Sequence, residues 1–413
     1  MVPILDNTDP YATLKLWDFR LFVLARFVMT FAVQMQSVIV GWQIYELTHD
    51  PLSLGLIGLS EAIPVLGIAL FAGHLADVVS RKKIIVICSS AYVICASSLF
   101  LVSTEFREIL VQHGTLPIYV IIFLAGLTRG LMSPAQAAFS AQLVPRELFG
   151  NASTWGSVSW QVADVVGPAV GGLIYGFVGV GSAYGMVVAT SIAGLFLFLA
   201  IKDKPMPERR RGESILQSLS EGIKFVFHDQ VILSAISLDM FAVFFGGAVA
   251  VLPIFADQVM HIGAKGLGFL RAAPAIGAIV MSVIQANYPV FKQAGRNLLR
   301  CVFGFGLMVI FFALSRNFYL SLVILMLGGA FDNVSVIVRW TIIQLYTPDA
   351  VRGRVSAVNG IFLGASNELG SFESGVAAKL MGLIPSVIFG GSMTLLVVAA
   401  VRTFAPKLRK LRL

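Results

Sequence analysis

Residues 142–153 of the chain read QLVPRELFGNAS, and residues 344–356 read QLYTPDAVRGRVS. Both stretches follow a long apolar run and carry a proline, a glycine and a serine in the same order. The three matched pairs keep a spacing of 203 residues, about half of the 413-residue chain: Pro145 and Pro348, Gly150 and Gly353, and Ser153 and Ser356. This recurrence predicts that the chain consists of two halves built on one plan.

The sequence around both stretches is strongly apolar. Apolar side chains make up 57% of the residues and charged ones 13%, whereas soluble domains average about 25% charged residues. A helix that crosses a bilayer needs about 20 mostly apolar residues, so the chain holds enough of them for about twelve crossings. The composition excludes an ordinary soluble enzyme, a disordered chain and a disulfide-stapled domain.

Long apolar runs predict an all-α membrane protein with twelve transmembrane helices in two pseudo-symmetric six-helix bundles. We expect an N-terminal bundle over 1–201, a cytoplasmic linker over 202–230 and a C-terminal bundle over 231–413. The predicted spans are 19–47, 54–77, 84–103, 117–141, 152–178, 182–201, 231–255, 266–288, 298–315, 318–344, 354–377 and 381–404.

A second recurrence indicates how the halves are related. GLSEAIPVLG at residues 58–67 returns as GFLRAAPAIG at residues 268–277, at a spacing of 210. Six spans return the chain to its starting side, so both copies of each stretch have the same orientation in the membrane. Parallel repeats of this kind are typical of secondary transporters whose site lies between the halves.

The lysines and arginines predict the orientation of the chain. The loops on the same side of the membrane as the two termini hold most of the lysines and arginines. The loops on the other side hold only Arg107, Lys265, Arg316 and Lys379. Because positively charged connections stay in the cytoplasm, both termini are predicted to be cytoplasmic. The same asymmetry accounts for the net charge of +8, so we expect no nucleic-acid partner.

The linker contains a helical pattern of its own. Ile215, Leu219, Ile223 and Val226 recur at helical spacing, which predicts an amphipathic helix on the cytoplasmic interface. Two interpretations of its basic half stay open, a solvated connection between the bundles and a site for anionic membrane lipid.

Residues 73–82 read GHLADVVSRK, and this stretch resembles the loop signature of the major facilitator superfamily. The match is partial, because Val78 replaces a basic residue and Ser80 replaces a glycine. The resemblance implies a loop that braces the cytoplasmic gate through Gly73, Asp77, Arg81 and Lys82, with Asp77 and Arg81 exchanging ion pairs. A positive-inside anchor alone would explain the basic residues but neither Gly73 nor Asp77.

Residues 163–172 read ADVVGPAVGG, which is similar to the Gly-Pro motif of the antiporter branches of that superfamily. Gly167, Gly171 and Gly172 would let another helix approach closely, and Pro168 permits a bend. Residues 238–248 and 367–375 resemble a narrower bacterial branch of drug and siderophore exporters, of the enterobactin-exporter and macrolide-efflux type. The resemblance of residues 163–172 to the Gly-Pro motif implies export.

Charged residues inside the spans are the candidates for the mechanism, because each must face a partner or a water-filled cavity. Arg129 occupies the place where the antiporter branches carry an arginine linked to proton transfer, although a salt bridge to Asp164 would also explain it. Among the acids, Asp239, Glu368 and Glu373 are candidates for a titrating carboxylate. The proton-coupling and cavity residues that we predict are Gln34, Arg129, Asp164, Asp239, Asp332, Arg339, Glu368 and Glu373.

Glu61 and Arg271 occupy equivalent places in the second recurrence. We interpret them as an outer gate pair or as paired contacts between the two halves. Neither a phosphate loop nor a metal-binding motif is present in the sequence, so we expect no metal, no cofactor and no enzymatic activity.

The sequence therefore predicts a secondary transporter of the bacterial cytoplasmic membrane that exports a small organic solute in exchange for protons. A monomer is expected from the fold that the resemblance implies. Alternatives are a proton symporter or uniporter for uptake and, from another class, a receptor or assembly subunit that does not transport.

Overall fold

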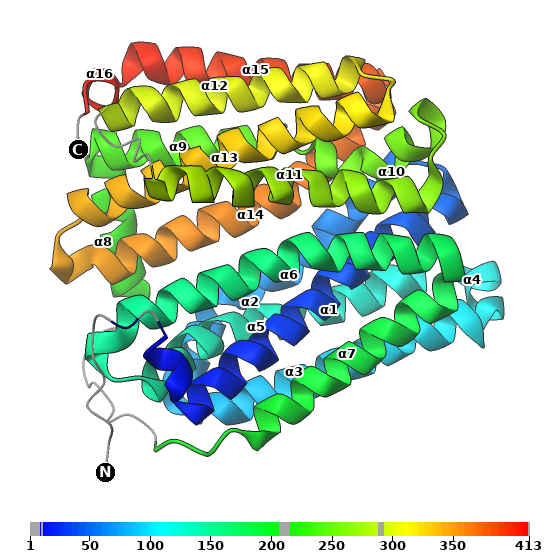
Figure 1. Cartoon of the computed structure of the whole chain (residues 1–413), viewed down its shortest axis with the longest axis horizontal. Coiled ribbons are helices and arrows are strands. Elements are labelled where there is room, and N and C mark those ends of the chain that lie inside the picture. Colours follow the sequence, from blue (N-terminus) through cyan, green and yellow to red (C-terminus); the bar gives the residue numbers. More distant parts are fainter. Residues whose placement is uncertain (1–8, 10, 206–214, 288–292, 412–413) are drawn as a thin grey trace. The chain divides into compact units, whose positions relative to one another are not determined.

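The computed structural model describes residue 9 and residues 11–205, 215–287 and 293–411, and these residues are helical and contain no strand. Figure 1 shows the order of the elements. The longer helices are α1 (Trp17–Thr48), α2 (Pro51–Val78), α3 (Arg81–Thr104), α5 (Leu116–Leu143), α6 (Phe149–Val178), α7 (Val180–Ala200), α8 (Ile215–His228), α9 (Gln230–Phe245), α11 (Gly263–Asn287), α12 (Ala294–Leu314), α13 (Phe318–Tyr346), α14 (Asp349–Met381) and α15 (Leu383–Phe404). The short elements are η1 (Thr13–Lys15), α4 (Arg107–His113), η2 (Arg146–Leu148), η3 (Ala248–Val251), α10 (Leu252–Ile254), η4 (Phe255–Val259) and α16 (Pro406–Arg409).

The chain forms two compact units. The first comprises Met1–Val40 and Ile63–Arg211, and the second comprises Gly41–Ala62 and Gly212–Leu413. Helix α3 packs on α5 and α7 in the first unit, whereas α13 packs on α11 and α12 in the second. The end of α1 and the beginning of α2 belong to the second unit, and the predicted division into three sequence ranges stays a prediction.

Eleven spans among the described residues are long and apolar enough to cross a membrane. The remaining predicted span, 354–377, is the eleventh in order and lies within α14, which is 33 residues long and therefore longer than a crossing requires. Its sequence is too polar to meet the same criterion, because it carries Glu368, Glu373 and Lys379 besides charged residues in its first turns. The twelve predicted spans thus correspond to twelve helical segments, of which α14 is the most polar.

Among the spans that the structure describes, the seventh is interrupted and is not a continuous α-helix. Its α-helical part, α9, stops at Phe245, and the span continues as η3, α10 and the π-helical η4 as far as Val259. Consecutive glycines, Gly246 and Gly247, follow α9 at the interruption. Discontinuous spans of this kind occur in transporters close to their binding sites.

The repeat is visible in how two helices end. Helix α6 ends at Gly179 and α14 ends at Gly382, again 203 residues apart, and the φ angles of these glycines are +102° and +88°. A residue with a side chain rarely adopts such angles, so both turns require glycine. The two halves therefore make the same turn between equivalent helices.

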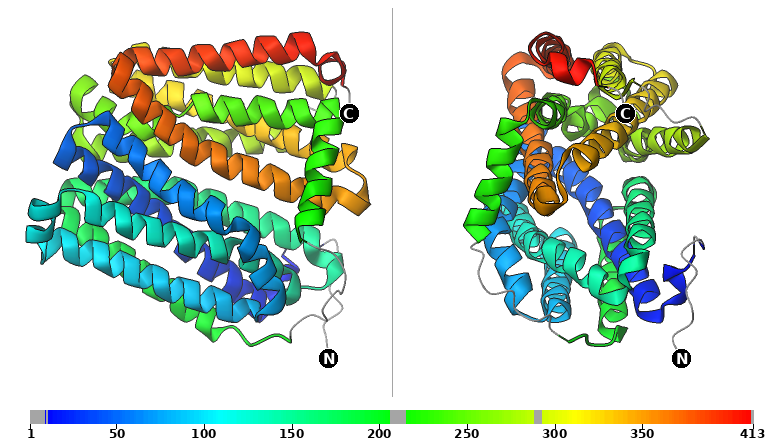
Figure 2. Two further views of the ribbon diagram at one scale, coloured as in Figure 1. Left: turned by 180° about the vertical axis from the view of Figure 1, so that it is seen from behind. Right: turned by 90° about the vertical axis from the view of Figure 1, so that its left-hand side faces the viewer.

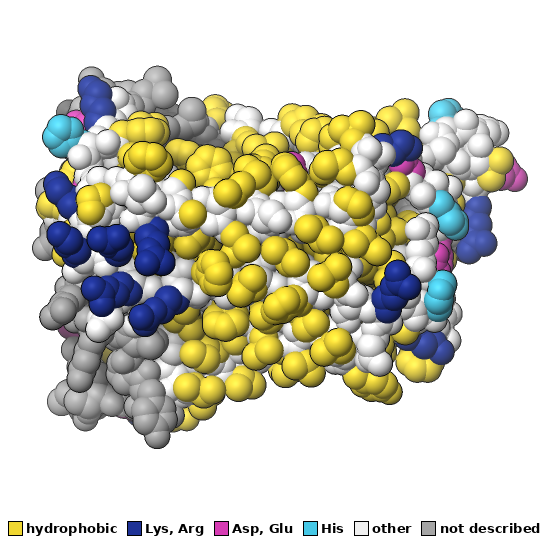
Figure 3. Space-filling view, turned by 90° about the horizontal axis from the view of Figure 1, so that it is seen from above, with side chains coloured by type: hydrophobic (Ala, Val, Ile, Leu, Met, Phe, Trp, Pro, Cys, Tyr) yellow, Lys and Arg dark blue, Asp and Glu magenta, His cyan; other side chains and the backbone are white. Residues whose placement is uncertain are grey.

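The surface agrees with a location in lipid. Figure 3 shows a face of the molecule on which hydrophobic side chains fill the middle and most Lys and Arg side chains lie near the two ends. Exposed side chains along α12 and α15 include Phe303, Phe311, Leu396 and Phe404. A soluble protein would rarely expose so many large apolar groups together, so these helices face the hydrocarbon of a bilayer.

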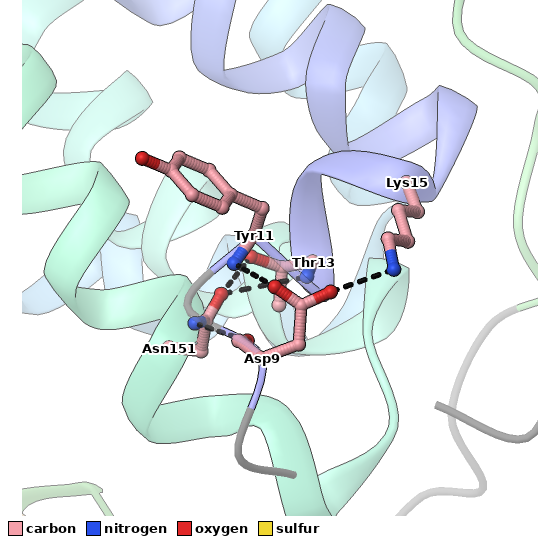
Figure 4. A network of polar contacts seen from close by, with 5 residues as sticks. All are labelled: Asp9, Tyr11, Thr13, Lys15 and Asn151. Carbon is pink, nitrogen blue, oxygen red and sulfur yellow. Dashed lines mark hydrogen bonds and ion pairs between the residues drawn. The ribbon is translucent and has the colours of Figure 1, made fainter. Parts of the chain in front are cut away.

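The segment before α1 is fixed to α6 by a polar network (Figure 4). The Thr13 hydroxyl donates to the Asn151 side chain, and the Asn151 amide donates to the Asp9 carbonyl at 3.5 Å. Lys15 lies 2.6 Å from the Asp9 carboxylate, and its hydrogen bond holds the pKa of that carboxyl below its usual range. Asn151 belongs to the stretch 142–153, so part of that stretch anchors the start of the chain.

Candidate functional site

Helices α1 and α6 meet in a tight seam in the first unit. A Cβ atom at Gly167 would lie 2.7 Å from Gln34 Cβ and 3.0 Å from the Phe31 carbonyl oxygen. One turn further, a Cβ at Gly171 would lie 3.0 Å from the Met35 carbonyl oxygen. The Gly-Pro motif therefore packs on α1, because glycine allows the two backbones to approach.

The same seam holds a polar pair. The Gln34 amide on α1 donates a hydrogen bond to the Asp164 carboxylate on α6. Gly167 lies one turn after Asp164, so the close approach of the helices brings these side chains within reach of each other. Sequence analysis selected Gln34 and Asp164 separately, and the structure joins them. Arg129 is half-buried on α5 in the same unit.

Arg26 is a charged residue of this seam that sequence analysis did not select. It lies nine residues into α1, and its Nη1 is 3.2 Å from a Cβ built on Gly156 of α6. Neither an ion pair nor a hydrogen bond joins Arg26 to the other residues that the structure describes. An arginine near the start of a span resembles a topology anchor, which is why the sequence alone gave no reason to choose it.

In the second unit, Asp239 of α9 and Arg339 of α13 form an ion pair, and their side chains are 4% and 3% exposed. Arg339 Nε is buried without an acceptor among the described residues. Asp332 lies about two turns before Arg339 on α13 and is half-buried, but the partner of Arg339 is Asp239. Both members of the pair were predicted as site residues, although the sequence did not link them.

Helix α14 carries the other predicted acids, Glu368 and Glu373, beside the interruption of the seventh span. A Cβ at Gly370 would lie 2.7 Å from the Phe244 carbonyl oxygen, so α14 touches the end of α9 there. Gly370 follows Gly167 by 203 residues. The contact between α14 and α9 thus repeats the contact between α6 and α1, and both halves place their predicted acids along an equivalent seam.

The beginning of α2 also packs on α14 within the second unit. Lys379 Nζ lies 2.7 Å from the Asp50 carboxylate, and a Cβ at Gly58 would lie 2.7 Å from Ser371 Cβ. Nearby, Glu61 on α2 and Arg271 on α11 are half-buried. Their role as an outer gate pair stays a prediction.

Comparison with known proteins identifies the family. A family model described as transmembrane secretion effector matches residues 8–412. The chain belongs to the transmembrane secretion effector family. It is therefore a multi-pass membrane transporter of the major facilitator type that acts on small molecules, and the known members among its relatives are transporters rather than enzymes.

The enterobactin exporter EntS of Escherichia coli O1:K1 is 28% identical to this chain over 396 residues, which cover 94% of this chain and 93% of the exporter. The same protein from Shigella boydii serotype 18 matches equally well. The resemblance to bacterial exporters predicted from residues 238–248 and 367–375 is confirmed.

Solved structures show the same fold. A POT family transporter in complex with 5-aminolevulinic acid superposes with a TM-score of 0.73 at 12% identity, covering 95% of this chain and 96% of that one. A D-xylose-proton symporter superposes with a TM-score of 0.71 at 14% identity, covering 95% and 99%. At these identities the likeness concerns the fold alone, and it confirms the predicted major facilitator architecture.

The loop signature of this transporter joins α2 to α3. The Asp77 side chain lies outside the described residues, so its predicted exchange of ion pairs stays a prediction. Arg81 donates to the Ala138 carbonyl at 3.1 Å, and Lys82 lies 3.2 Å from the Asp203 carboxylate. Within the first unit, Arg81 therefore fastens the loop to α5 and Lys82 fastens it to the segment after α7.

No group of three or more metal-ligating side chains occurs in the part of the chain that the structure describes. Gly73, Pro168 and Gly172 lie on α2 and α6 as predicted. Pro168 and Gly172 are buried, which suits a packing role.

Proposed function

We propose that this transporter exports a small organic solute from the cytoplasm in exchange for protons, by alternating access. The observation that carries the proposal is the Asp239–Arg339 ion pair, which lies inside two spans and is almost fully buried. A buried charge pair is costly to desolvate and contributes little net stability. Charged residues at such depth are characteristic of proton and substrate pathways.

The pair suggests how a proton could drive the cycle. A proton that binds to the Asp239 carboxylate cancels its negative charge and removes the attraction to Arg339. The contact between α9 and α13 then loses its main electrostatic component, and the interrupted end of the seventh span can shift. Loss of the proton to the other side restores the pair, so one proton is taken up and one is released in each cycle.

The seam of the first unit would contact the solute. Gln34 and Asp164 offer an amide and a carboxylate, and Arg26 and Arg129 offer positive charge. Because Arg26 has no ion-pair partner among the described residues, an anionic group on the solute would offset the cost of keeping it inside a span. Glu368 and Glu373 are further candidates for proton binding in the second unit.

The relatives support the direction and the type of solute. The 28% identical relative is named an enterobactin exporter, so we propose export of a siderophore-like or drug-like organic molecule. We further propose the bacterial cytoplasmic membrane as the location, cytoplasmic termini, and a monomer as the working unit. Alternating access requires that the contacts between the beginning of α2 and α14, including Asp50–Lys379, form and part in each cycle.

Transport by the purified protein in proteoliposomes tests the proposal, with enterobactin and a macrolide as labelled probes and an imposed pH gradient. We expect the gradient to accelerate movement of a probe against the proton flow, and Asp239→Asn to abolish that acceleration. Glu108→Gln is the matched control, because Glu108 is an exposed acid on α4, outside the spans. Acceleration in the opposite direction would indicate symport, and gradient-independent flux would indicate uniport. No flux of any probe would favour the receptor or assembly alternative.

A further inference from the structure

Helix α8 differs from the long helices because it runs across their ends rather than along them (Figure 2). Within the second unit it packs on α9 and α14. Val226 is 1% exposed and lies in an apolar cluster with Ile232 and Ile236 of α9 and Val355 and Val358 of α14. This side of α8 is therefore fixed to two helices of the unit.

Beside this buried side, α8 keeps two apolar side chains exposed in the described structure. Ile223 and Phe227 are four residues apart, hence neighbours on one face, and they are 38% and 59% exposed. Lys224 and His228 are exposed beside them. A row of apolar side chains flanked by basic ones is the pattern of helices that lie in a bilayer interface.

The depth of α8 follows from the span that comes after it. Asp229 caps α9 by accepting hydrogen bonds from the backbone amides of Val231 and Ile232 at 2.8 and 2.9 Å. Because α9, the first part of the seventh candidate span, begins at Gln230, we expect the end of α8 to lie close to the membrane boundary. Phe227 stands two residues before this cap.

The charges on α8 favour a negatively charged surface. Glu221, an acid on the described part of the helix, forms an ion pair with Arg354 of α14. Its negative charge is thereby compensated, which leaves Lys224 as the uncompensated charge on the exposed side. In the sequence, three consecutive arginines, Arg209 to Arg211, also precede α8. Basic segments beside a membrane attract anionic lipids.

We propose that α8 is an interfacial helix that binds anionic phospholipid, with Ile223 and Phe227 in contact with the acyl chains and Lys224 in contact with the headgroup phosphate. The linker between the two halves would then be held at the bilayer surface instead of being solvated. The Glu221–Arg354 pair would connect this lipid-bound helix to α14, the helix that carries Glu368 and Glu373.

A spin label at residue 227 tests the location. The label is attached to Phe227→Cys in full-length protein whose three cysteines, Cys88, Cys95 and Cys301, are replaced by alanine, and the protein is reconstituted in phosphatidylcholine with or without phosphatidylglycerol. Collisions with oxygen report lipid, and collisions with a water-soluble nickel chelate report water. Leu396→Cys, on a lipid-facing span, and Arg409→Cys, on the exposed α16, provide the two reference values.

We expect the label at residue 227 to resemble that at Leu396, with oxygen collisions exceeding nickel collisions, and Ile223→Cys to agree. Phosphatidylglycerol should shift the label at residue 227 deeper. Lys224→Gln should abolish this shift, whereas Lys407→Gln, at an exposed lysine of α16, should preserve it. A label that resembles Arg409 would overturn the interfacial location, and a label equally deep with and without phosphatidylglycerol would overturn the preference for anionic lipid. Since the measurement requires no transport, its failure would leave the proposed function untouched.

Discussion

Asp239 on α9 and Arg339 on α13 are 100 residues apart in the sequence, and in the structure their buried side chains form an ion pair inside the second unit. The pair connects the interrupted seventh span to a neighbouring span. Two opposite charges buried together cost far less than one charge buried alone. Variants that remove one charge and a variant that removes both therefore distinguish the contribution of the pair to stability from its role in transport.

We predict that Asp239→Asn and Arg339→Gln each destabilise the protein by about 3–5 kcal/mol, because each leaves one uncompensated buried charge. The double variant Asp239→Asn/Arg339→Gln should recover most of that loss, since neither charge remains. Thermal unfolding in detergent measures all three. A double variant as unstable as the sum of the single ones would contradict the pairing.

The same three variants separate stability from coupling. If the pair binds the transported proton, the stable double variant still fails to use a pH gradient, because it has no carboxylate at residue 239. Transport in proteoliposomes provides the measurement, with Glu108→Gln as the control. Gradient-driven transport by the double variant would restrict the pair to a structural role.

Two glycines should respond in opposite ways to substitution by alanine: Gly167, in the seam between α1 and α6, and Gly67, in α2. Gly167→Ala should destabilise the protein by about 1–3 kcal/mol, because the new methyl group would lie 2.7 Å from Gln34 Cβ. Gly67→Ala, in α2, should be neutral or stabilising by about 0.5–1 kcal/mol, since no described atom lies within 4 Å of its Cβ position. Thermal unfolding in detergent compares the stability of the two variants. Equal stability would mean that the contact between α1 and α6 has room for a methyl group at residue 167.

The sequence predicted the spans well because their signal is local. Each predicted span falls within a few residues of a helical segment, since a run of apolar residues long enough to cross lipid has few alternatives to a helix. The interruption after Phe245 was missed. Its residues are as apolar as the rest of the span, and the break depends on contacts with α14 that lie more than 120 residues away in the sequence.

The sequence selected residues of the candidate site, but it did not predict the Gln34–Asp164 and Asp239–Arg339 pairs that the structure shows. Charges inside spans are conspicuous, so Asp164, Asp239 and Arg339 were selected correctly as buried or half-buried groups. Their partners depend on which helices touch and at what level, and hydropathy contains no such information. Arg26 was missed for a related reason, because only its contact with α6 distinguishes it from an arginine that reaches towards the headgroups.

Replacement of Arg26 by an uncharged residue should increase the stability of the protein. Arg26→Met keeps the length of the side chain and removes a charge that has no ion-pair partner among the described residues. A central arginine costs about 2.5–3.5 kcal/mol on insertion scales, so at this shallower position we expect a gain of about 1 kcal/mol in the absence of solute. Arg300→Met, at an exposed residue of α12, should change little.

Arg26→Met should stabilise the protein but impair its transport of anionic solutes. We expect Arg26→Met to transport anionic solutes more slowly than the unmodified protein and neutral ones at an unchanged rate. Competition by an organic acid and by its neutral amide measures this in proteoliposomes. A destabilised Arg26→Met would mean that the arginine contributes to the fold, and an unchanged preference for the acid would exclude it from the solute site.

A reducible cross-link between positions 50 and 379 should block transport reversibly. The Asp50 and Lys379 side chains are 2.7 Å apart and partly exposed, so cysteines at both positions, in protein without its native cysteines, should react with a short cleavable bis-thiosulfonate reagent. The cross-link fixes the beginning of α2 to the end of α14. If these segments must part in each cycle, the cross-linked protein stops transporting and a thiol reductant restores its rate. Asp50→Cys alone, treated in the same way, should remain active. Full transport by cross-linked protein would show that the two segments stay together throughout the cycle, and the opening movement would then have to occur elsewhere.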